Sequence, residues 1–168
     1  MMASEQNSEQ KKAEIHIGLD STNRKAVVKR LSKLLADEQV LYTKLRNYHW
    51  NVQGMFFQTL HLFFQDQYTI LFTVTDDIAE RIRSLGEFSI GALNAFLDNT
   101  RLKETGHLDG NAEKMLQNIL KDHELIIRKI RGDITIVQNL KDEGTADFLI
   151  GLMEQHEKMA WMVRSHLG

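Results

Sequence analysis

The chain has 168 residues, of which 42% are hydrophobic and 26% are charged, and this is enough for one domain with a substantial core. Its 21 basic residues nearly balance its 23 acidic ones, so the chain as a whole is no polycation that would attract nucleic acid. It contains no cysteine, which excludes disulfides, zinc knuckles, thiol nucleophiles and iron–sulfur clusters.

The first 22 residues predict a flexible polar arm ahead of a single domain over residues 23–168. They contain no apolar signal-peptide core, and no stretch of the chain approaches eighteen apolar residues in a row. We therefore expect an unprocessed cytoplasmic protein with no membrane segment.

Two long helices are predicted in the first half. The residues Asp20 to Asn23 are all good N-cap residues, and the apolar positions that follow recur at helical spacing until the chain reaches Asn51 to Gly54. A second helix is predicted from about Phe57 to Leu85, and it is apolar around much of its circumference. Such a helix is usually buried on more than one side, so we expect it to form a subunit interface as well.

The second half predicts two further long helices, which start near Asn111 and near Thr145, and a short one over Ser89 to Leu97. With no strand signal, the fold class is all-α, a ferritin-like four-helix bundle. The long connection from Gly86 to Asn111 is then the crossover between helices two and three, and it carries the short extra helix.

Four ligand-type side chains lie on otherwise apolar helices in the stretch from Asn47 to Gly86. His49 and His61 lie near its start, while Asp76 and Glu80 lie near its end at a spacing of four, on one helix face. Imidazole and carboxylate together suit a divalent first-row metal such as iron.

These residues cannot all bind one metal ion within a single subunit, because fifteen residues of helix from His61 to Asp76 span about 22 Å. Either they share no metal, or two copies of the helix lie antiparallel in a two-fold dimer that contains two sites. A di-iron site inside one bundle would need Glu-x-x-His on two helices, and this spacing occurs only from Glu104 to His107, in a loop.

Several motifs together resemble the Dps proteins, the mini-ferritins of starved bacterial cells. They are HWNVQG at 49–54, the histidine twelve residues after His49, DDIAERIRSLG at 76–86, KDEGTADFL at 141–149 and EQHEKMAWMVR at 154–164. The resemblance implies a hollow dodecamer that protects against oxidative stress. It also implies ferroxidase centres at two-fold interfaces, an oxidoreductase activity on iron, hydrogen peroxide as the chief oxidant, and ferric mineral stored inside.

By the same resemblance, His49 and His61 of one subunit and Asp76 and Glu80 of its partner are the metal ligands and catalytic residues. Gln65 is a departure, because the family usually has a carboxylate at this position, and Asp66 points about 100° away around the helix. Gln65 remains a possible ligand, and His166 near the C-terminus is a possible extra imidazole, although a solvated terminal histidine is the alternative. We expect the change to shift metal preference toward zinc.

The acids at the start of the fourth helix have two interpretations. Asp142, Glu143 and Asp147 suit the positive end of the helix dipole, and the resemblance implies that Asp142 and Asp147 line an iron-entry pore. His123 and His156 fall in apolar series and are predicted to be satisfied core or interface histidines. Trp50 and Trp161 are predicted to pack in the core, with sacrificial oxidation near the iron as an alternative for Trp50.

DNA binding is the second function that the resemblance implies, as a non-enzymatic, nucleoid-associated alternative to iron oxidation. The arm does not support it, because residues 1–23 hold two lysines against four acids, and phosphate contacts are electrostatic. We expect DNA binding to be weak or absent.

Overall fold

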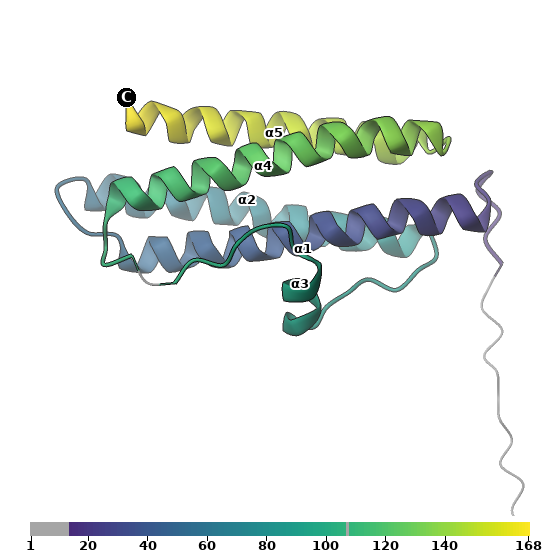
Figure 1. Ribbon diagram of the computed structural model, residues 1–168, viewed down its shortest axis with the longest axis horizontal. Helices are drawn as coiled ribbons and strands as arrows, with labels where there is room; N and C mark the ends of the chain where they lie inside the picture. The colour runs from purple at the N-terminus through teal and green to yellow at the C-terminus, as the bar shows by residue number, and fades with distance from the viewer. Residues whose placement is uncertain (1–13, 107) are drawn as a thin grey trace, which may run out of the picture.

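The computed structural model describes residues 14–106 and 108–168, and the regular secondary structure in this part is helical apart from one isolated bridge (Figure 1). Five helices follow one another along the chain: α1 (Ser21–Asn51), α2 (Phe57–Ser84), α3 (Leu93–Asn99), α4 (Ala112–Asn139) and α5 (Glu143–Leu167). None of the described helices is long and apolar enough to cross a membrane.

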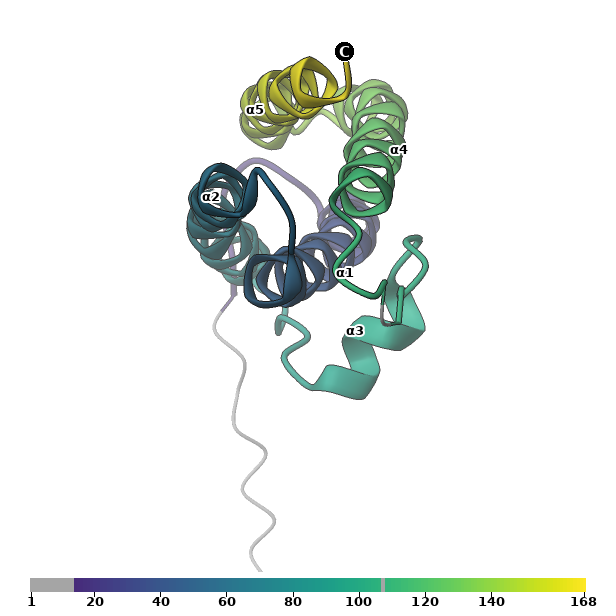
Figure 2. The ribbon, with the colours of Figure 1, turned by 90° about the vertical axis from the view of Figure 1, so that its left-hand side faces the viewer.

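The four long helices form two antiparallel hairpins, α1 with α2 and α4 with α5. Seen end-on, they occupy the corners of a bundle, and α3 lies outside it beside α1 (Figure 2). The predicted four-helix bundle with a short extra helix in the crossover is therefore confirmed. Of the predicted N-terminal arm, residues 1–13 lie outside the described part of the chain.

Helices α1 and α4 begin where N-cap side chains predicted them to begin. The carboxylate of Asp20 accepts a hydrogen bond from the backbone N–H of Asn23 at 2.8 Å, and Asn111 caps α4 in the same way through Lys114 at 2.9 Å. The fourth long helix starts two residues before the predicted Thr145, because Asp142 is its N-cap.

The short crossover helix lies later in the chain than the predicted Ser89 to Leu97. It starts at Leu93, and the residue before it, Ala92, is extended. Its end is fixed by the loop that follows, where the Thr100 hydroxyl and the Arg101 backbone N–H donate to one Asp37 carboxylate at 2.9 and 2.5 Å. This contact with α1 sets where the helix stops, and helical periodicity does not report it.

An ion pair inside the bundle holds the rest of the crossover. The Lys44 ammonium on α1 lies 2.5 Å from the Asp122 carboxylate on α4 and also donates to the Lys103 carbonyl at 2.8 Å. Burial raises the pKa of the Asp122 carboxyl, and the bond from Lys44 opposes that rise. Because both side chains are largely shielded from water, removing either one would leave the other charge buried without its partner.

Candidate metal centre

The turn between α1 and α2 brings His49 and His61 together. Their rings stack with centroids 3.7 Å apart and planes at 21°. The Nδ1 of His49 lies 2.7 Å from the carbonyl oxygen of His61, and the Nδ1 of His61 lies 2.8 Å from the carbonyl oxygen of His49. The hairpin therefore closes on a reciprocal pair of side chain to backbone hydrogen bonds.

These two bonds fix the tautomer of both rings. A carbonyl oxygen only accepts, so each Nδ1 must carry the hydrogen and donate it. In the neutral form of each ring, Nε2 then holds the lone pair. A metal-binding histidine is oriented in just this way, by a backbone acceptor for its second nitrogen. Both rings are thus prepared to offer Nε2 to a metal ion.

Aromatic side chains enclose the histidine pair. The Tyr68 ring meets His49 edge-on with centroids 5.4 Å apart, and the Phe57 ring lies 5.2 Å from that of His61. His49 is buried, and His61 is half-buried. The two rings therefore have little freedom to rotate.

The predicted carboxylate ligands lie far along the same helix. Asp76 and Glu80 are exposed on α2, and Asp76 is about 22 Å from His61 by helical rise. Among residues 14–106 and 108–168, no group of three or more histidine, cysteine, aspartate or glutamate side chains comes close enough to hold a metal. Each half of the predicted centre therefore lacks the other half within the described subunit.

Gln65 lies on the same face of α2 as His61, beside the histidine pair. It lies one turn after His61 and is exposed. Asp66 is also exposed, but it is rotated by about 100° around the helix and cannot replace a carboxylate at position 65.

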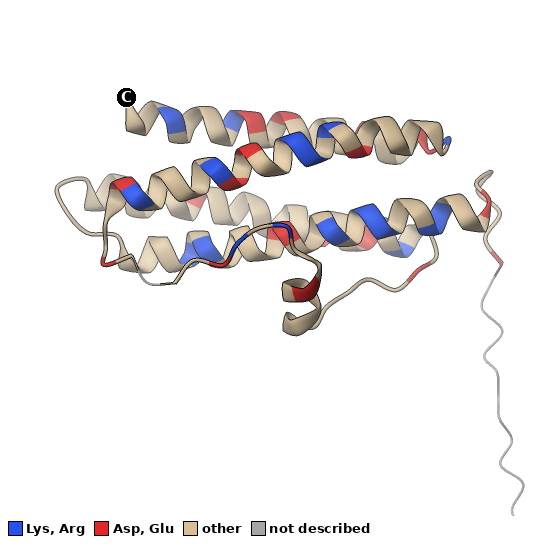
Figure 3. Ribbon diagram, viewed as in Figure 1, with Lys and Arg blue, Asp and Glu red and all other residues tan. Residues whose placement is uncertain are grey.

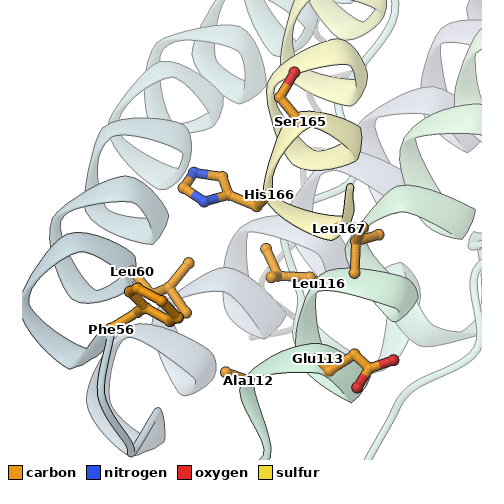
Figure 4. Close-up of a pocket in the computed structure, with 8 residues that line it drawn as sticks. All are labelled: Phe56, Leu60, Ala112, Glu113, Leu116, Ser165, His166 and Leu167. Carbon is orange, nitrogen blue, oxygen red and sulfur yellow. The ribbon is translucent and has the colours of Figure 1, made fainter.

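The structure does not bring His166 to the histidine pair. Its ring packs on Phe63 with centroids 4.5 Å apart, and Phe63 is two residues from His61, on almost the opposite side of α2. His166 instead lines a cavity of about 430 Å³ at one end of the bundle (Figure 4). Within the subunit, His166 is therefore an exposed residue at a separate place, and its role as an extra ligand stays a prediction.

The two predicted pore acids have different surroundings. Asp142 is 3% exposed, and its carboxylate accepts from the Thr145 backbone N–H at 2.9 Å, from the Thr145 hydroxyl at 2.6 Å and from Arg81 at 2.9 Å. All of these bonds lie within the subunit, so Asp142 caps α5 and ties it to α2. Asp147 is exposed, together with Glu143, and lines a groove between α2 and α5.

The prediction that both tryptophans pack in the core is wrong for this subunit. Trp50 is 62% exposed and Trp161 is 60% exposed, so neither packs in the core of the subunit. The Arg46 guanidinium lies 4.9 Å from the Trp50 ring centroid in a cation–π contact on the surface of α1.

The predicted core histidines are confirmed, and the structure adds partners that the sequence analysis did not single out. His123 and His156 are fully buried and lie with Nδ1 atoms 2.9 Å apart, and Gln67 and Glu38 flank them. Glu38 and Gln67 fall within the apolar series of α1 and α2, and this register was the available signal.

Comparison with known proteins agrees with this architecture. A family model described as a ferritin-like domain matches residues 28–168. A low temperature-induced protein of Nostoc sp. is 42% identical over 154 residues, which are 91% of this chain and 86% of that protein. The DNA protection during starvation protein 2 of Bacillus anthracis is 39% identical over 144 residues, which are 86% of this chain and 98% of that protein.

A solved structure extends the likeness to three dimensions. The Dps protein of Vibrio cholerae, described as a member of a broad superfamily of ferritin-like diiron-carboxylate proteins, superposes with a TM-score of 0.88 at 30% identity. The match covers 93% of this chain and 98% of that one.

Proposed function

The chain belongs to the Dps proteins within the ferritin-like family, and from this membership we propose that it oxidises ferrous iron and stores the ferric product inside a hollow homo-oligomer, expected to be a dodecamer. The activity is that of an oxidoreductase acting on metal ions. Hydrogen peroxide is the proposed chief oxidant, the cytoplasm is the proposed location, and protection against oxidative stress is the proposed result.

The geometry of His49 and His61 carries this proposal. Both rings donate through Nδ1 to backbone carbonyls, which leaves Nε2 of each neutral ring as a metal ligand. Asp76 and Glu80 of a partner subunit would complete the centre, since the described part of one subunit has no third ligand near the rings.

An antiparallel pairing of two α2 helices would join the halves twice. Tyr68 and Thr69 lie midway between His61 and Asp76, so a two-fold axis near them would place His61 of one subunit opposite Asp76 of the other and create two equivalent centres. Phe72 lies one turn before Asp76 on this face and is 64% exposed. Covering so large an apolar side chain in a dimer would stabilise the pairing.

Each reactant and each ligand has a simple role in such a centre. The imidazoles and carboxylates hold ferrous ions, the substrate, near one another, and each ion gives up one electron. One peroxide takes two electrons, its O–O bond breaks, and the oxygens leave as water or enter ferric oxyhydroxide. Because the reaction consumes ferrous iron and peroxide together, it keeps them from forming hydroxyl radical in solution.

Gln65 would set the metal preference of the proposed centre. A neutral amide is a poorer ligand than a carboxylate for a hard cation, so we propose a centre that binds iron less tightly and accepts zinc more readily than one with an acid at this position. Asp147 is the proposed pore acid, because it is exposed and Asp142 is already bonded within the subunit.

Ferrous oxidation followed by absorbance, with peroxide and with oxygen as the oxidant, tests the proposal. We expect faster oxidation with peroxide and a ferric product that stays in solution with the protein. A His61→Ala variant is expected to lose the peroxide-driven rate. Binding of ferrous iron without oxidation by either oxidant would contradict the proposal.

A second candidate function, non-enzymatic DNA binding, is favoured by one feature of the surface. Lys25, Lys29 and Lys33 are exposed at a spacing of four along α1, and Figure 3 shows the basic bands there. Such a stripe would attract phosphates in a salt-dependent way. A mobility-shift assay at low and moderate salt separates the two candidates: strong salt-sensitive shifts without peroxide-driven oxidation would favour DNA binding alone.

A further inference from the structure

A chain of four polar side chains crosses the centre of the bundle. Glu38 comes from α1, Gln67 from α2, His123 from α4 and His156 from α5, so each long helix contributes one member. Gln67 is 2% exposed and the other three are 0% exposed. Polar groups at such depth are costly unless they bond to one another, so their contacts determine whether the four helices can pack together.

The hydrogen bonds that link His156, His123 and Gln67 all point the same way, toward Gln67. The Gln67 amide nitrogen donates to the Met159 carbonyl at 3.4 Å, which turns its oxygen toward Nε2 of His123 at 3.1 Å. An amide oxygen only accepts, so Nε2 of His123 must carry a hydrogen. The Nδ1 of a neutral His123 then holds the lone pair. The lone pair faces Nδ1 of His156 at 2.9 Å, so His156 is the donor there.

The last contact joins His156 to Glu38. The Nε2 of His156 is 2.9 Å from Oε1 of Glu38, but the pair is not aligned as a hydrogen bond. Coulombic attraction does not require such alignment, so the contact fits an imidazolium beside a carboxylate. An imidazolium at His156, an ionised Glu38 and a neutral His123 are consistent with all of these contacts.

Among the residues that the structure describes, no charged sequence neighbour of the four members joins the polar chain. The sequence neighbours of its members turn away: Asp37 binds Arg101, Asp122 binds Lys44, Glu157 binds Arg131, and Asp66 is exposed. The Glu38 carboxylate is therefore the charge that balances a protonated ring in this chain.

We propose that the Glu38–His156–His123–Gln67 chain is an acid-sensitive lock at the centre of the bundle, closed while His123 is neutral and opened when His123 gains a proton. A proton on Nδ1 of His123 would face the N–H of His156 at 2.9 Å, where two donors meet. It would also place a second positive ring beside the first. The bond between α4 and α5 would then be replaced by repulsion.

The sign of the pH effect follows from burial. Burial, followed by the facing His156, lowers the pKa of His123 well below its ordinary value of 6.5. The unfolded chain therefore binds this proton at a higher pH than the folded chain does. The stability that the lock contributes is fully present above pH 6.5 and is lost as the pH falls below it, by about tenfold in the unfolding equilibrium constant per pH unit.

Urea unfolding of the full-length protein and of His123→Gln, at one protein concentration and at several pH values between 7.5 and 4.5, tests the lock. Glutamine offers an acceptor to His156 and a donor to Gln67 but cannot take up the proton. We expect the ratio of the wild-type to the variant unfolding constant to rise about tenfold per pH unit below 6.5. His16→Gln is the matched control, because His16 is exposed on the surface, and its ratio should not change. A ratio that stays constant for His123→Gln overturns the proposal.

Hydrogen exchange of the unmodified protein gives an independent test if His123→Gln does not fold. After correction for the intrinsic exchange rate at each pH, peptides that contain His123 or His156 are expected to lose protection between pH 7 and pH 5. Equal protection at the two pH values would contradict the lock. Neither experiment requires iron, so the result does not depend on the proposed ferroxidase activity.

Discussion

Replacing Asp142 by alanine is expected to destabilise the subunit without slowing iron oxidation. The variant loses the N-cap of α5, the bond from the Thr145 hydroxyl and the bond from Arg81. A lost cap costs about 1 kcal/mol, and a lost bond to a charged group costs about 1.5–3 kcal/mol. Because Arg81 keeps some access to water, we expect each of the two bonds to contribute near its lower end, which with the cap gives a loss of about 4 kcal/mol in total.

Urea unfolding followed by far-UV circular dichroism measures this loss. With a denaturant slope of about 2 kcal/mol per molar, the midpoint should fall by about 2 M. Asp147→Ala is the matched control, because Asp147 is exposed: its stability should stay within about 0.5 kcal/mol of wild type, while its initial rate of ferrous oxidation falls. An Asp142→Ala variant that is as stable as wild type but oxidises iron slowly would refute this reasoning.

Two further substitutions test the interior and the metal preference. Lys44→Met should cost about 3–5 kcal/mol by leaving the Asp122 carboxylate buried and unpaired, and adding Asp122→Leu should recover most of it. The loss of stability of the single variant should be smaller in acid, because the pKa of the Asp122 carboxyl is raised in the folded state and the group becomes protonated there. Unfolding curves at pH 7 and pH 4 measure this difference. Gln65→Asp should speed ferrous oxidation and weaken inhibition by zinc in the same absorbance assay, whereas Asp66→Asn should change neither.

Much of the fold could be predicted because helices carry local signals. Apolar spacing gave the four long helices, and Asp20 and Asn111 marked the starts of α1 and α4. The bounds of α3 could not be read in this way, because the loop after it is held by Asp37, far away in the sequence. Trp50 and Trp161 were assigned to the core from residue type alone, which does not report the helix face.

The candidate site could be predicted only in its composition. Helical rise alone places His61 and Asp76 about 22 Å apart, whatever the tertiary structure. The stacking of His49 on His61 depends on how the α1–α2 turn closes, so spacing could not predict it. Glu38 and Gln67 lay in apolar registers, but only the packing of all four helices shows that they meet His156 and His123.

A co-assembly experiment tests most directly whether two subunits share each metal centre. His61→Ala and Asp76→Ala should each abolish peroxide-driven ferrous oxidation when assembled alone. When the two variants are mixed and reassembled at random, half of the dimers are mixed, and each mixed dimer has one intact centre, so about one quarter of the wild-type rate should return. A mixture as inactive as its components would contradict the shared centre.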